Sequence, residues 1–432
     1  MKSFNPSQKL LLPPEDLFDI HPHKKYQILF SHLDSSPLEN LNPHGPGRPP
    51  ISYQALLKTL IYKNLKTLPT LFDLAVDLID NPHLALQCGL ITGTNPHTVK
   101  QRLSSFLRNT PNPPLQKIKN TLITELVSLG EINGHFLSID SCDILANVKE
   151  NNLKTSVKER FNKFKKLKGD PDARVGVLIH FKKNSGKQIE CFWGYRNHVV
   201  LDAISELPVA EITKPANVHE QTLFIPLFTQ VQNAFNFPVK EVLADAMYDV
   251  EYILKFVIND LNALPRIARN PRRQIHSDVK PSRTGGLICI AGFNMLYWGK
   301  FKDRGKIRLK FVCPVTNSKK FAKQHPLCPW LHPKFLKGNG CIAYLRGDSN
   351  IRASIDYGSE SFKQSYNRRT SSERVFSRLL TLSMQNPSVI GLHATANHCT
   401  IAHITVLLIA LTAVKTGHKD KIRFIKKFLP FI

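Results

Sequence analysis

Residues 136–140 read Phe-Leu-Ser-Ile-Asp, and residues 241–245 read Glu-Val-Leu-Ala-Asp. Each stretch has a short apolar run, typical of a buried strand, that closes on an aspartate. A carboxylate there is costly unless it is paired or binds a metal ion, and the carboxyl ends of strands are where α/β sheets place their sites. The two stretches therefore predict a divalent-metal site at Asp140 and Asp245, although each aspartate alone is more often a cap or turn residue.

The segments around these two stretches complete the pattern of an α/β core. Further strands are expected at residues 175–181, 192–200 and 207–213, and helices at residues 222–235 and 250–261. We expect Asp249 to cap the second of these helices. Strands first, and then alternating helix and strand, predict a mixed sheet flanked by helices.

Residues 52–108 have a helical period instead. Three helices are expected, and the third begins at Asn95. On this third helix we expect Val99, Leu103, Phe106 and Leu107 to face inward, and Lys100, Arg102 and Arg108 to face outward. A small helical unit with a basic last helix is typical of helix-turn-helix-like DNA contact, and a helical packing or dimerisation domain is the alternative.

The charge balance indicates a polyanionic partner. The 432 residues include 59 Lys and Arg against 33 Asp and Glu, which gives a formal net charge of +26. A protein this basic is drawn to nucleic acid or to an anionic membrane surface. The longest apolar run, residues 401–414, would span ~21 Å as a helix, short of the ~30 Å hydrocarbon core of a bilayer. We therefore expect a buried core helix, a nucleic-acid partner and no membrane partner.

The first residues and the cysteines predict a cytoplasmic protein. Residues 1–6 lack the basic and apolar regions of a secretory signal. The eight cysteines include no Cys-x-x-Cys pair, which favours reduced thiols. Cys313, Cys328, His332 and Cys341 carry atoms that suit zinc, but because their spacing is irregular, buried or free thiols are the preferred interpretation.

Basic side chains also gather in segments outside the helical region. Residues 1–45 are rich in Pro and His and predict a tail, and Arg48 follows in a Gly-Arg-Pro-Pro stretch that fits either a linker or an A·T-rich minor groove. The candidates for phosphate contacts in two later basic segments are Lys163, Lys165, Lys166, Arg272 and Arg273. Each segment alone is compatible with a solvated loop, but together they favour binding to DNA phosphates.

Tyr366, Arg369 and Glu373 are spaced three and four residues apart, so a helix would place them along one face. The apolar residues that follow, from Val375 to Leu380, indicate that this helix packs on the core. Glu373 would then face the sheet edge that carries the two aspartates. A surface ion pair between Arg369 and Glu373 is the alternative.

In their order along the chain, these pieces resemble the DDE transposases of bacterial insertion sequences, in the branch with a Tyr-x2-Arg-x3-Glu-x6-Lys signature. The resemblance runs from Gly47 to about Val414 and rests on Gly-Arg-Pro-Pro at 47–50, Phe-Leu-Ser-Ile-Asp-Ser at 136–141, Asp-Pro-Asp-Ala-Arg-Val-Gly at 170–176, Gly-Tyr-Arg-Asn-His at 194–198, Leu-Ala-Asp-Ala-Met-Tyr-Asp at 243–249 and Ser-Glu-Arg-Val-Phe-Ser-Arg-Leu at 372–379. Each piece is weak alone, and their joint order is specific.

The resemblance implies an RNase H-like core and a catalytic triad of Asp140, Asp245 and Glu373 that holds two Mg²⁺ or Mn²⁺ ions. It also implies that Tyr366 and Arg369 contact the DNA phosphate. The expected partners are double-stranded DNA, both element ends and target, and a second copy of the chain when bound to DNA, in the cytoplasm and nucleoid of a bacterium. Leu380 stands where the signature has Lys, so the DNA contact of that lysine is not carried over.

We therefore expect an α/β fold with an RNase H-like mixed sheet flanked by helices, an all-α N-terminal domain and a basic insertion before the last catalytic helix. The expected boundaries are a tail at 1–45, a helical DNA-binding domain at 46–125, the two parts of the core at 126–270 and 355–415, the insertion at 271–354 and a basic tail at 416–432. The expected function is transposition. The alternatives are an RNase H-like nuclease or resolvase without strand transfer and a catalytically inactive DNA-binding protein.

Overall fold

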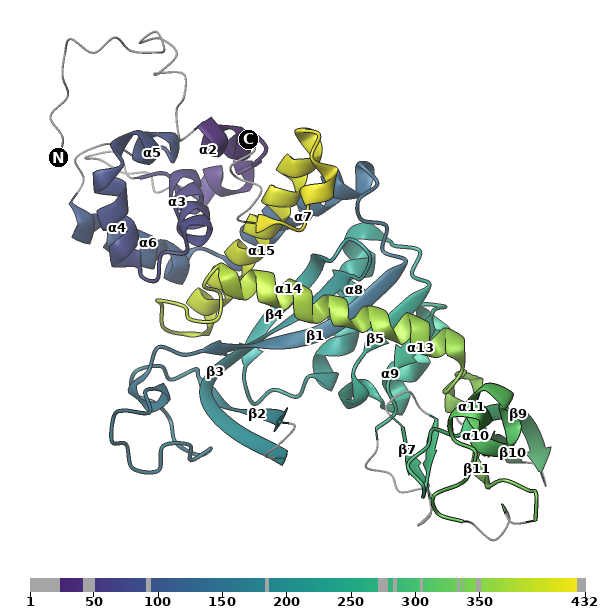
Figure 1. The fold of residues 1–432 in the computed structure, drawn as a ribbon. Coiled ribbons are helices and arrows are strands. Elements are labelled where there is room, and N and C mark those ends of the chain that lie inside the picture. Colours follow the sequence, from purple (N-terminus) through teal and green to yellow (C-terminus); the bar gives the residue numbers. More distant parts are fainter. Residues whose placement is uncertain are drawn as a thin grey trace, which may run out of the picture. The chain divides into compact units, whose positions relative to one another are not determined.

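The computed structural model describes residues 24–41, 51–90, 95–182, 186–270, 279–282, 286–303, 306–331, 335, 337–346 and 351–425. The chain divides into two compact units (Figure 1). The helical unit comprises Met1–Leu126 and Arg378–Ile432, and the sheet unit comprises Val127–Ser377. The last long helix, which the sequence pattern assigned to the catalytic core, thus groups with the N-terminal helices.

The helical unit is built from helices of which α3, α4 and α6 begin with a side-chain cap. Its helices are α2 (Lys24–Ser31), α3 (Tyr53–Lys66), α4 (Leu71–Asp80), α5 (Pro82–Gln87), α6 (Pro96–Asn109), α7 (Asn112–Ser128) and α15 (Leu392–Lys415), with a short 3-10 helix η1 (Ser36–Leu41). Thr70 and Asp73 form a capping box at the start of α4, and the side chain of Asn95 accepts a hydrogen bond from the amide of His97 at the start of α6. The inward face expected for α6 is confirmed, since Val99, Leu103, Phe106 and Leu107 are buried.

Helix α15 is longer than the apolar run suggested. Its 24 residues are long and apolar enough to cross a membrane by length and composition, but the apolar window is fully buried inside the protein. The side chain of Asn397 donates hydrogen bonds of 2.9 and 2.8 Å to the carbonyls of Leu107 and Thr110 at the end of α6. The helix therefore lies in the interior of the helical unit, as expected of a core helix.

The sheet unit contains a mixed sheet that matches most of the expected strands. Its strands are β1 (Phe136–Leu145), β2 (Arg174–Lys182), β3 (Gly186–Asp202), β4 (Leu207–Pro215), β5 (Glu241–Ala244) and β6 (Leu264–Ile267). The order is β2-β3-β1-β5-β6, and β4 also pairs with β3. β1 runs antiparallel to β3 and parallel to β5, and β5 runs parallel to β6. β1 is therefore an interior strand.

Helices cover both faces of this sheet. The hydroxyls of Ser138 on β1 and Ser372 on α14 (Thr370–Thr381) are 2.8 Å apart. Ser141, three residues further along β1, donates a 3.0 Å hydrogen bond to Glu220 at the start of α8 (Gln221–Phe235). Because side chains three apart on a strand point to opposite faces, α14 and α8 lie on opposite sides of the sheet.

Two expectations about local structure were wrong. Asp140 does not end its strand, because β1 continues to Leu145 in antiparallel pairing with β3. Asp249 does not cap the next helix: its carboxylate binds Arg352 at 3.0 Å and accepts the amide of Asn270. The helix α9 (Glu251–Lys255) begins without a side-chain cap and continues as a π-helical turn, η4 (Phe256–Asp260).

The insertion forms a small folded module of its own. Its described elements are β7 (Val279–Pro281), β8 (Leu287–Cys289), β9 (Leu296–Asp303), β10 (Lys306–Val312), α10 (Pro314–Asn317), α11 (Lys319–Gln324) and β11 (Ile342–Arg346). β11, β10 and β9 form an antiparallel sheet in that order, and β7 pairs with β8. After the short η5 (Ile351–Ser354), the chain continues as α13 (Glu360–Tyr366), the 3-10 turn η6 (Asn367–Arg369) and α14.

Candidate active site

The sheet places Asp140 and Asp245 at the same level on neighbouring parallel strands. Phe136 pairs with Glu241, and the register continues to the pair of Ser138 and Leu243. Two further residues in the same register bring Asp140 level with Asp245. The two carboxylates are thus neighbours because of strand pairing, although they are far apart in the sequence.

Asp140 is a carboxylate in a poorly solvated position. Only 21% of its side chain is exposed. Burial and, to a smaller extent, the charge of Asp245 raise the pKa of Asp140, while the amide of Ser141 and the guanidinium of Arg369 oppose the shift; the result is a pKa of about 7. Near neutral pH this group is therefore divided between its acid and its carboxylate, and a nearby cation would favour the carboxylate.

Asp245 follows β5 directly, as the sequence predicted. One of its oxygens accepts a 2.8 Å hydrogen bond from the amide of Met247, which caps the short 3-10 helix η3 (Ala246–Tyr248). Burial raises the pKa of Asp245, and the charge of Glu220 adds to that effect. Asp245 therefore caps η3 and also belongs to the candidate site. The structural role that was its alternative interpretation is present beside the proposed one.

Arg369 joins Asp140 to Glu373. Its two terminal nitrogens lie 3.3 Å from the Asp140 carboxylate and 2.9 Å from that of Glu373. The i,i+4 ion pair that was the alternative interpretation is therefore present, and the same guanidinium also reaches Asp140 on the sheet. Glu373 has 63% of its side chain exposed, in contrast to Asp140. Burial acts to lower the pKa of Arg369, but Tyr366, Asp140 and Glu373 together hold it above its ordinary value.

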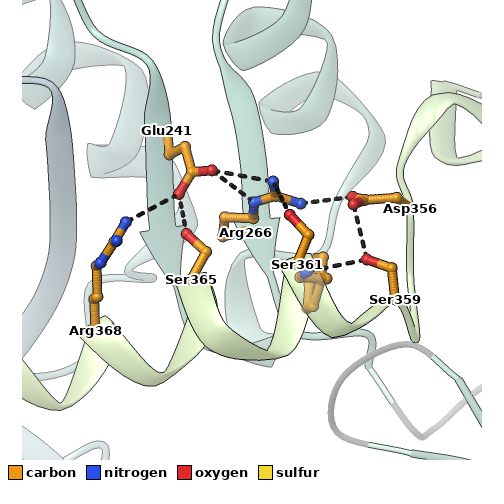
Figure 2. A network of polar contacts seen from close by, with 8 residues as sticks. Glu241, Arg266, Asp356, Ser359, Ser361, Ser365 and Arg368 are labelled. Carbon is orange, nitrogen blue, oxygen red and sulfur yellow. Dashed lines mark hydrogen bonds and ion pairs between the residues drawn. The ribbon is translucent and has the colours of Figure 1, made fainter.

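A polar network connects α13 and η6 to strands β5 and β6 of the sheet (Figure 2). Glu241 on β5 forms a 3.0 Å ion pair with Arg266 on β6 and accepts a hydrogen bond from the hydroxyl of Ser365 on α13. Arg266 is buried and also binds Asp356 at 2.6 Å, just before α13. Arg368, in η6, lies 3.8 Å from Glu241. The network therefore connects α13 and η6, the turn that contains Arg369, to the sheet.

The donor atoms are of the kind that a divalent ion prefers. Carboxylate oxygens suit Mg²⁺ and Mn²⁺, and the hydroxyl of Tyr248, fully buried, has no hydrogen-bond partner among the described residues. In the part of the chain that the structure describes, no three His, Cys, Asp or Glu side chains are arranged so that they could hold a metal ion. The positive charge beside Asp140 and Glu373 is that of the Arg369 guanidinium. The residues fit by their chemistry, and binding of an ion would require Arg369 to leave at least one of its two carboxylates.

The sequence interpretation missed Glu220, which lies beside the two aspartates. Its carboxylate accepts a 3.0 Å hydrogen bond from Ser141 and a 2.7 Å bond from Arg196, and Arg196 also binds Asp143 at 2.9 Å. Gln221, the next residue, donates a short hydrogen bond to the carbonyl of Met247. The start of α8 is therefore tied to both aspartate-bearing segments. The only sequence signal for this contact is Arg196, which lies in the Gly-Tyr-Arg-Asn-His stretch at 194–198. Its partner, Glu220, comes from a segment that the sequence pattern does not connect to it.

Two comparisons with known proteins found similarity, and a third did not. A family model described as "Transposase domain (DUF772)" matches residues 15–109, and this match supports a transposase. A solved structure, the piggyBac transposase synaptic complex with hairpin DNA, is 10% identical, with a TM-score of 0.40 over 95% of this chain and 78% of that chain. No curated protein matches the chain.

The residues expected to bind DNA differ in their exposure and in their contacts. Lys100 and Arg102 are exposed on the outer face of α6. Lys163 lies 5.0 Å from the ring centre of Phe164, and Lys165 binds Glu150 at 3.2 Å, so that part of its charge is already balanced. Lys166 is exposed in the same loop. The remaining candidates, Arg48, Arg272 and Arg273, lie outside the described residues, as does His332.

Tyr366 is packed rather than free. Its ring stacks on Phe362 with centroids 6.0 Å apart, and burial raises its pKa. Leu380, which replaces the signature lysine, is 38% exposed on α14. An apolar side chain at a partly exposed position offers no charge to a phosphate, so any DNA contact near this turn of the helix must come from other residues.

Proposed function

We propose that the chain is a DDE transposase with an RNase H-like core. It would bind the ends of a mobile DNA element, cleave them and join the freed 3′-hydroxyl to target DNA. The observation that carries the proposal is the level placement of Asp140 and Asp245 on paired strands, with Arg369 connecting Asp140 to Glu373. The family match over residues 15–109 supports the same class.

The fold around the site is consistent with this proposal. An RNase H-like core requires a mixed sheet flanked by helices, and the sheet unit contains one, with α14 and α8 on opposite faces. The catalytic helix arrives after the insertion and is held by the Glu241–Arg266 network. These features support the proposed core without fixing the reaction.

The chemistry assigns a role to each carboxylate. Asp140, Asp245 and Glu373 would hold two Mg²⁺ or Mn²⁺ ions, which, when bound, activate the attacking oxygen and stabilise the leaving oxygen of an in-line displacement. In cleavage, the oxygen of water forms a bond to phosphorus and the bond to the 3′ oxygen breaks, so that a 3′-hydroxyl is released. In joining, that hydroxyl attacks a target phosphorus and displaces the target's own 3′ oxygen.

Arg369 would then exchange partners during the reaction. In the structure it neutralises Asp140 and Glu373. A guanidinium released from carboxylates is well suited to a phosphate, because its planar fork matches two phosphate oxygens. Tyr366, packed beside it, would limit the directions that the Arg369 side chain can take.

The test is a cleavage and strand-transfer assay on DNA that carries the inverted repeats flanking the gene. Asp140→Ala, Asp245→Ala and Glu373→Ala should each abolish Mg²⁺-dependent cleavage, since each removes an ion ligand. DNA binding should survive, because loss of a carboxylate lowers repulsion of phosphate. Circular dichroism must show that each variant is folded, above all Glu373→Ala, whose helix packs on the core.

Exposed carboxylates provide matched controls. Asp260→Ala and Glu360→Ala remove one charge each from exposed positions in the sheet unit and should leave cleavage unchanged. Cleavage without strand transfer by the parent chain would favour the nuclease or resolvase alternative. A folded Asp245→Ala or Glu373→Ala protein that cuts as well as the parent would contradict the triad and favour a DNA-binding protein without catalysis.

A further inference from the structure

Four of the eight cysteines lie in the insertion, at positions 289, 313, 328 and 341. Cys289, Cys313 and Cys328 are buried and Cys341 is partly buried, and none of them forms a disulfide. The sequence interpretation had grouped Cys313, Cys328 and Cys341 with His332, which lies outside the described residues. The structure offers Cys289 as a fourth thiol from a separate strand.

The strands of the insertion bring two of these cysteines opposite each other. The antiparallel register of β10 and β11 ends at the pair of Val312 and Ile342. One step further, the same register sets Cys313 opposite Cys341. The neighbouring Gly340 lies so close to Cys313 that a Cβ added to the glycine would meet the Cys313 Cβ at 2.3 Å. A larger residue there would push the two cysteine-bearing segments apart.

The other two thiols approach from different segments. Cys289 ends β8 and belongs to the core cluster against which Cys341 packs. Cys328 follows α11 in a turn in which the amide of Leu331 donates a 3.0 Å hydrogen bond to the Cys328 carbonyl. Burial, together with the thiols of Cys313, Cys289 and Cys328, raises the pKa of Cys341 to about 11. All three are therefore electrostatic neighbours of Cys341.

Three explanations for such a cluster can be compared. Buried cysteines can act as small apolar side chains, and Cys313 and Cys341 could form a cross-strand disulfide. Neither explanation accounts for Cys341 lying opposite Cys313 across two strands, packing on the core cluster that contains Cys289 and having Cys328 as a further electrostatic neighbour. Small modules with short strands and a limited core commonly need a metal or a disulfide for stability, and four cysteines from separate elements are a usual ligand set of structural zinc.

We propose that Cys289, Cys313, Cys328 and Cys341 form a structural zinc site that holds the insertion together. Each thiol would lose its proton, so that one Zn²⁺ and four thiols give a tetrathiolate complex and four released protons. Since no three of the described His, Cys, Asp and Glu side chains are arranged to hold an ion in the structure, binding must draw the thiols closer.

The first experiment measures metal in the full chain, produced with zinc supplied and purified without chelator. Elemental analysis should find about one Zn²⁺ per chain. Exchange for Co²⁺ should give the absorption of a tetrahedral thiolate site. Cys313→Ser and Cys341→Ser should reduce the zinc content to near zero, whereas Cys191→Ser, a partly buried cysteine on β3, should leave it unchanged.

A second experiment uses only the parent chain and therefore does not depend on the folding of variants. Thiol alkylation followed by peptide mass spectrometry should show that all four cysteines are protected, and a chelator should expose all four together. A zinc-free folded protein, a Cys313–Cys341 disulfide or full zinc content in Cys313→Ser would each overturn the site. None of these measurements involves DNA, so they are independent of the proposed transposition.

Discussion

At the scale of single residues, the half-buried cation Arg369 and the buried cation Lys63 differ in their partners. Arg369 has carboxylate partners on both sides, but the ammonium of Lys63 on α3 has no hydrogen-bond partner among the described residues. Lys63 is 2% exposed. Burial lowers its pKa to about 8, and Asp73 opposes the shift only partly. The cost of this charge makes Lys63 a clear test of burial in the helical unit.

Lys63→Met should raise the melting temperature at pH 7. The folded-state pKa of Lys63 lies below its ordinary value of 10.5, so the unfolded chain binds more protons between about pH 8 and pH 10.5. The stability of the parent therefore rises over that window. At pH 7 the buried charge costs at most ~3 kcal/mol, and we expect a gain of about 1–3 kcal/mol that shrinks to near zero at about pH 10.5. Thermal unfolding from pH 6 to pH 10.5 measures the difference.

The matched control is Lys66→Met, which removes an exposed lysine from the same helix. It should change stability by less than ~0.5 kcal/mol at every pH. If Lys63→Met melts below the parent at pH 7, or if its advantage is the same at both ends of the pH range, the ammonium is solvated or paired in solution.

At the scale of elements, ionic contacts connect α13 and η6 to the sheet. α13 and η6 are connected to β5 and β6 through Arg266, whose side chain is 4% exposed and which binds both Glu241 and Asp356. The Arg266 guanidinium also lies 5.6 Å from the ring centre of Phe362. Because Arg369 follows three residues after Tyr366, a small rotation of α13 would move it away from Asp140.

Arg266→Met should destabilise the sheet unit by about 3 kcal/mol, because removing one member of a buried ion pair leaves the other charge without compensation. Chemical denaturation followed by circular dichroism measures the loss. The double variant Arg266→Met/Glu241→Gln should recover part of it, since the uncompensated charge of Glu241 is then gone. Cleavage by Arg266→Met should also fall, through the altered position of Arg369.

An exposed ion pair in the same unit provides the comparison. Lys255 and Glu251 form an i,i+4 pair at 2.8 Å with 56% of each side chain exposed, and Lys255→Met should cost less than ~0.5 kcal/mol. An Arg266→Met variant that is no less stable than Lys255→Met would mean that packing, rather than the ionic network, holds α13.

Local sequence patterns predicted where helices and strands lie better than they predicted which segments contact each other. The apolar face of α6 and the strands around Asp140 and Asp245 follow from periodicity, which is a property of neighbouring residues. The extension of β1 past Asp140, the partnership of Asp249 with Arg352 and the place of Glu220 beside the aspartates all depend on segments that are distant in sequence. No local pattern contains that information. The small sheet of the insertion was also missed, because basic residues and prolines obscure the alternation of its strands.

At the scale of the whole molecule, the dominant property is charge. The net charge of +26 is divided unevenly: +10 lies in the helical unit, +14 in residues 271–354 of the insertion and +2 in the rest of the sheet unit. Lys100 and Arg102 on α6 are two of the exposed cations of the helical unit. Some cations are balanced internally, as Lys165 is by Glu150. The number of cations available to an external polyanion is therefore smaller than the formal charge suggests.

DNA binding by the full chain should be strongly dependent on salt. With about 6 to 10 phosphate contacts, affinity should fall ~10³- to 10⁵-fold between about 50 and 200 mM salt, because bound phosphates release their counterions. Fluorescence anisotropy with the flanking repeat DNA measures this slope. An affinity that barely changes over this range would show that the charge serves another purpose, such as solubility.

The division of the helical unit between the two ends of the chain has a consequence for synthesis on the ribosome. α2 to α7 emerge early, but α15, whose apolar window is fully buried in the finished protein, emerges only after the whole of Val127–Ser377. At roughly 5 to 20 residues per second, the nascent helices wait on the order of 10 to 50 seconds for their central helix. During that interval their apolar faces are open to chaperones, and the sheet unit has time to fold before the helical unit closes.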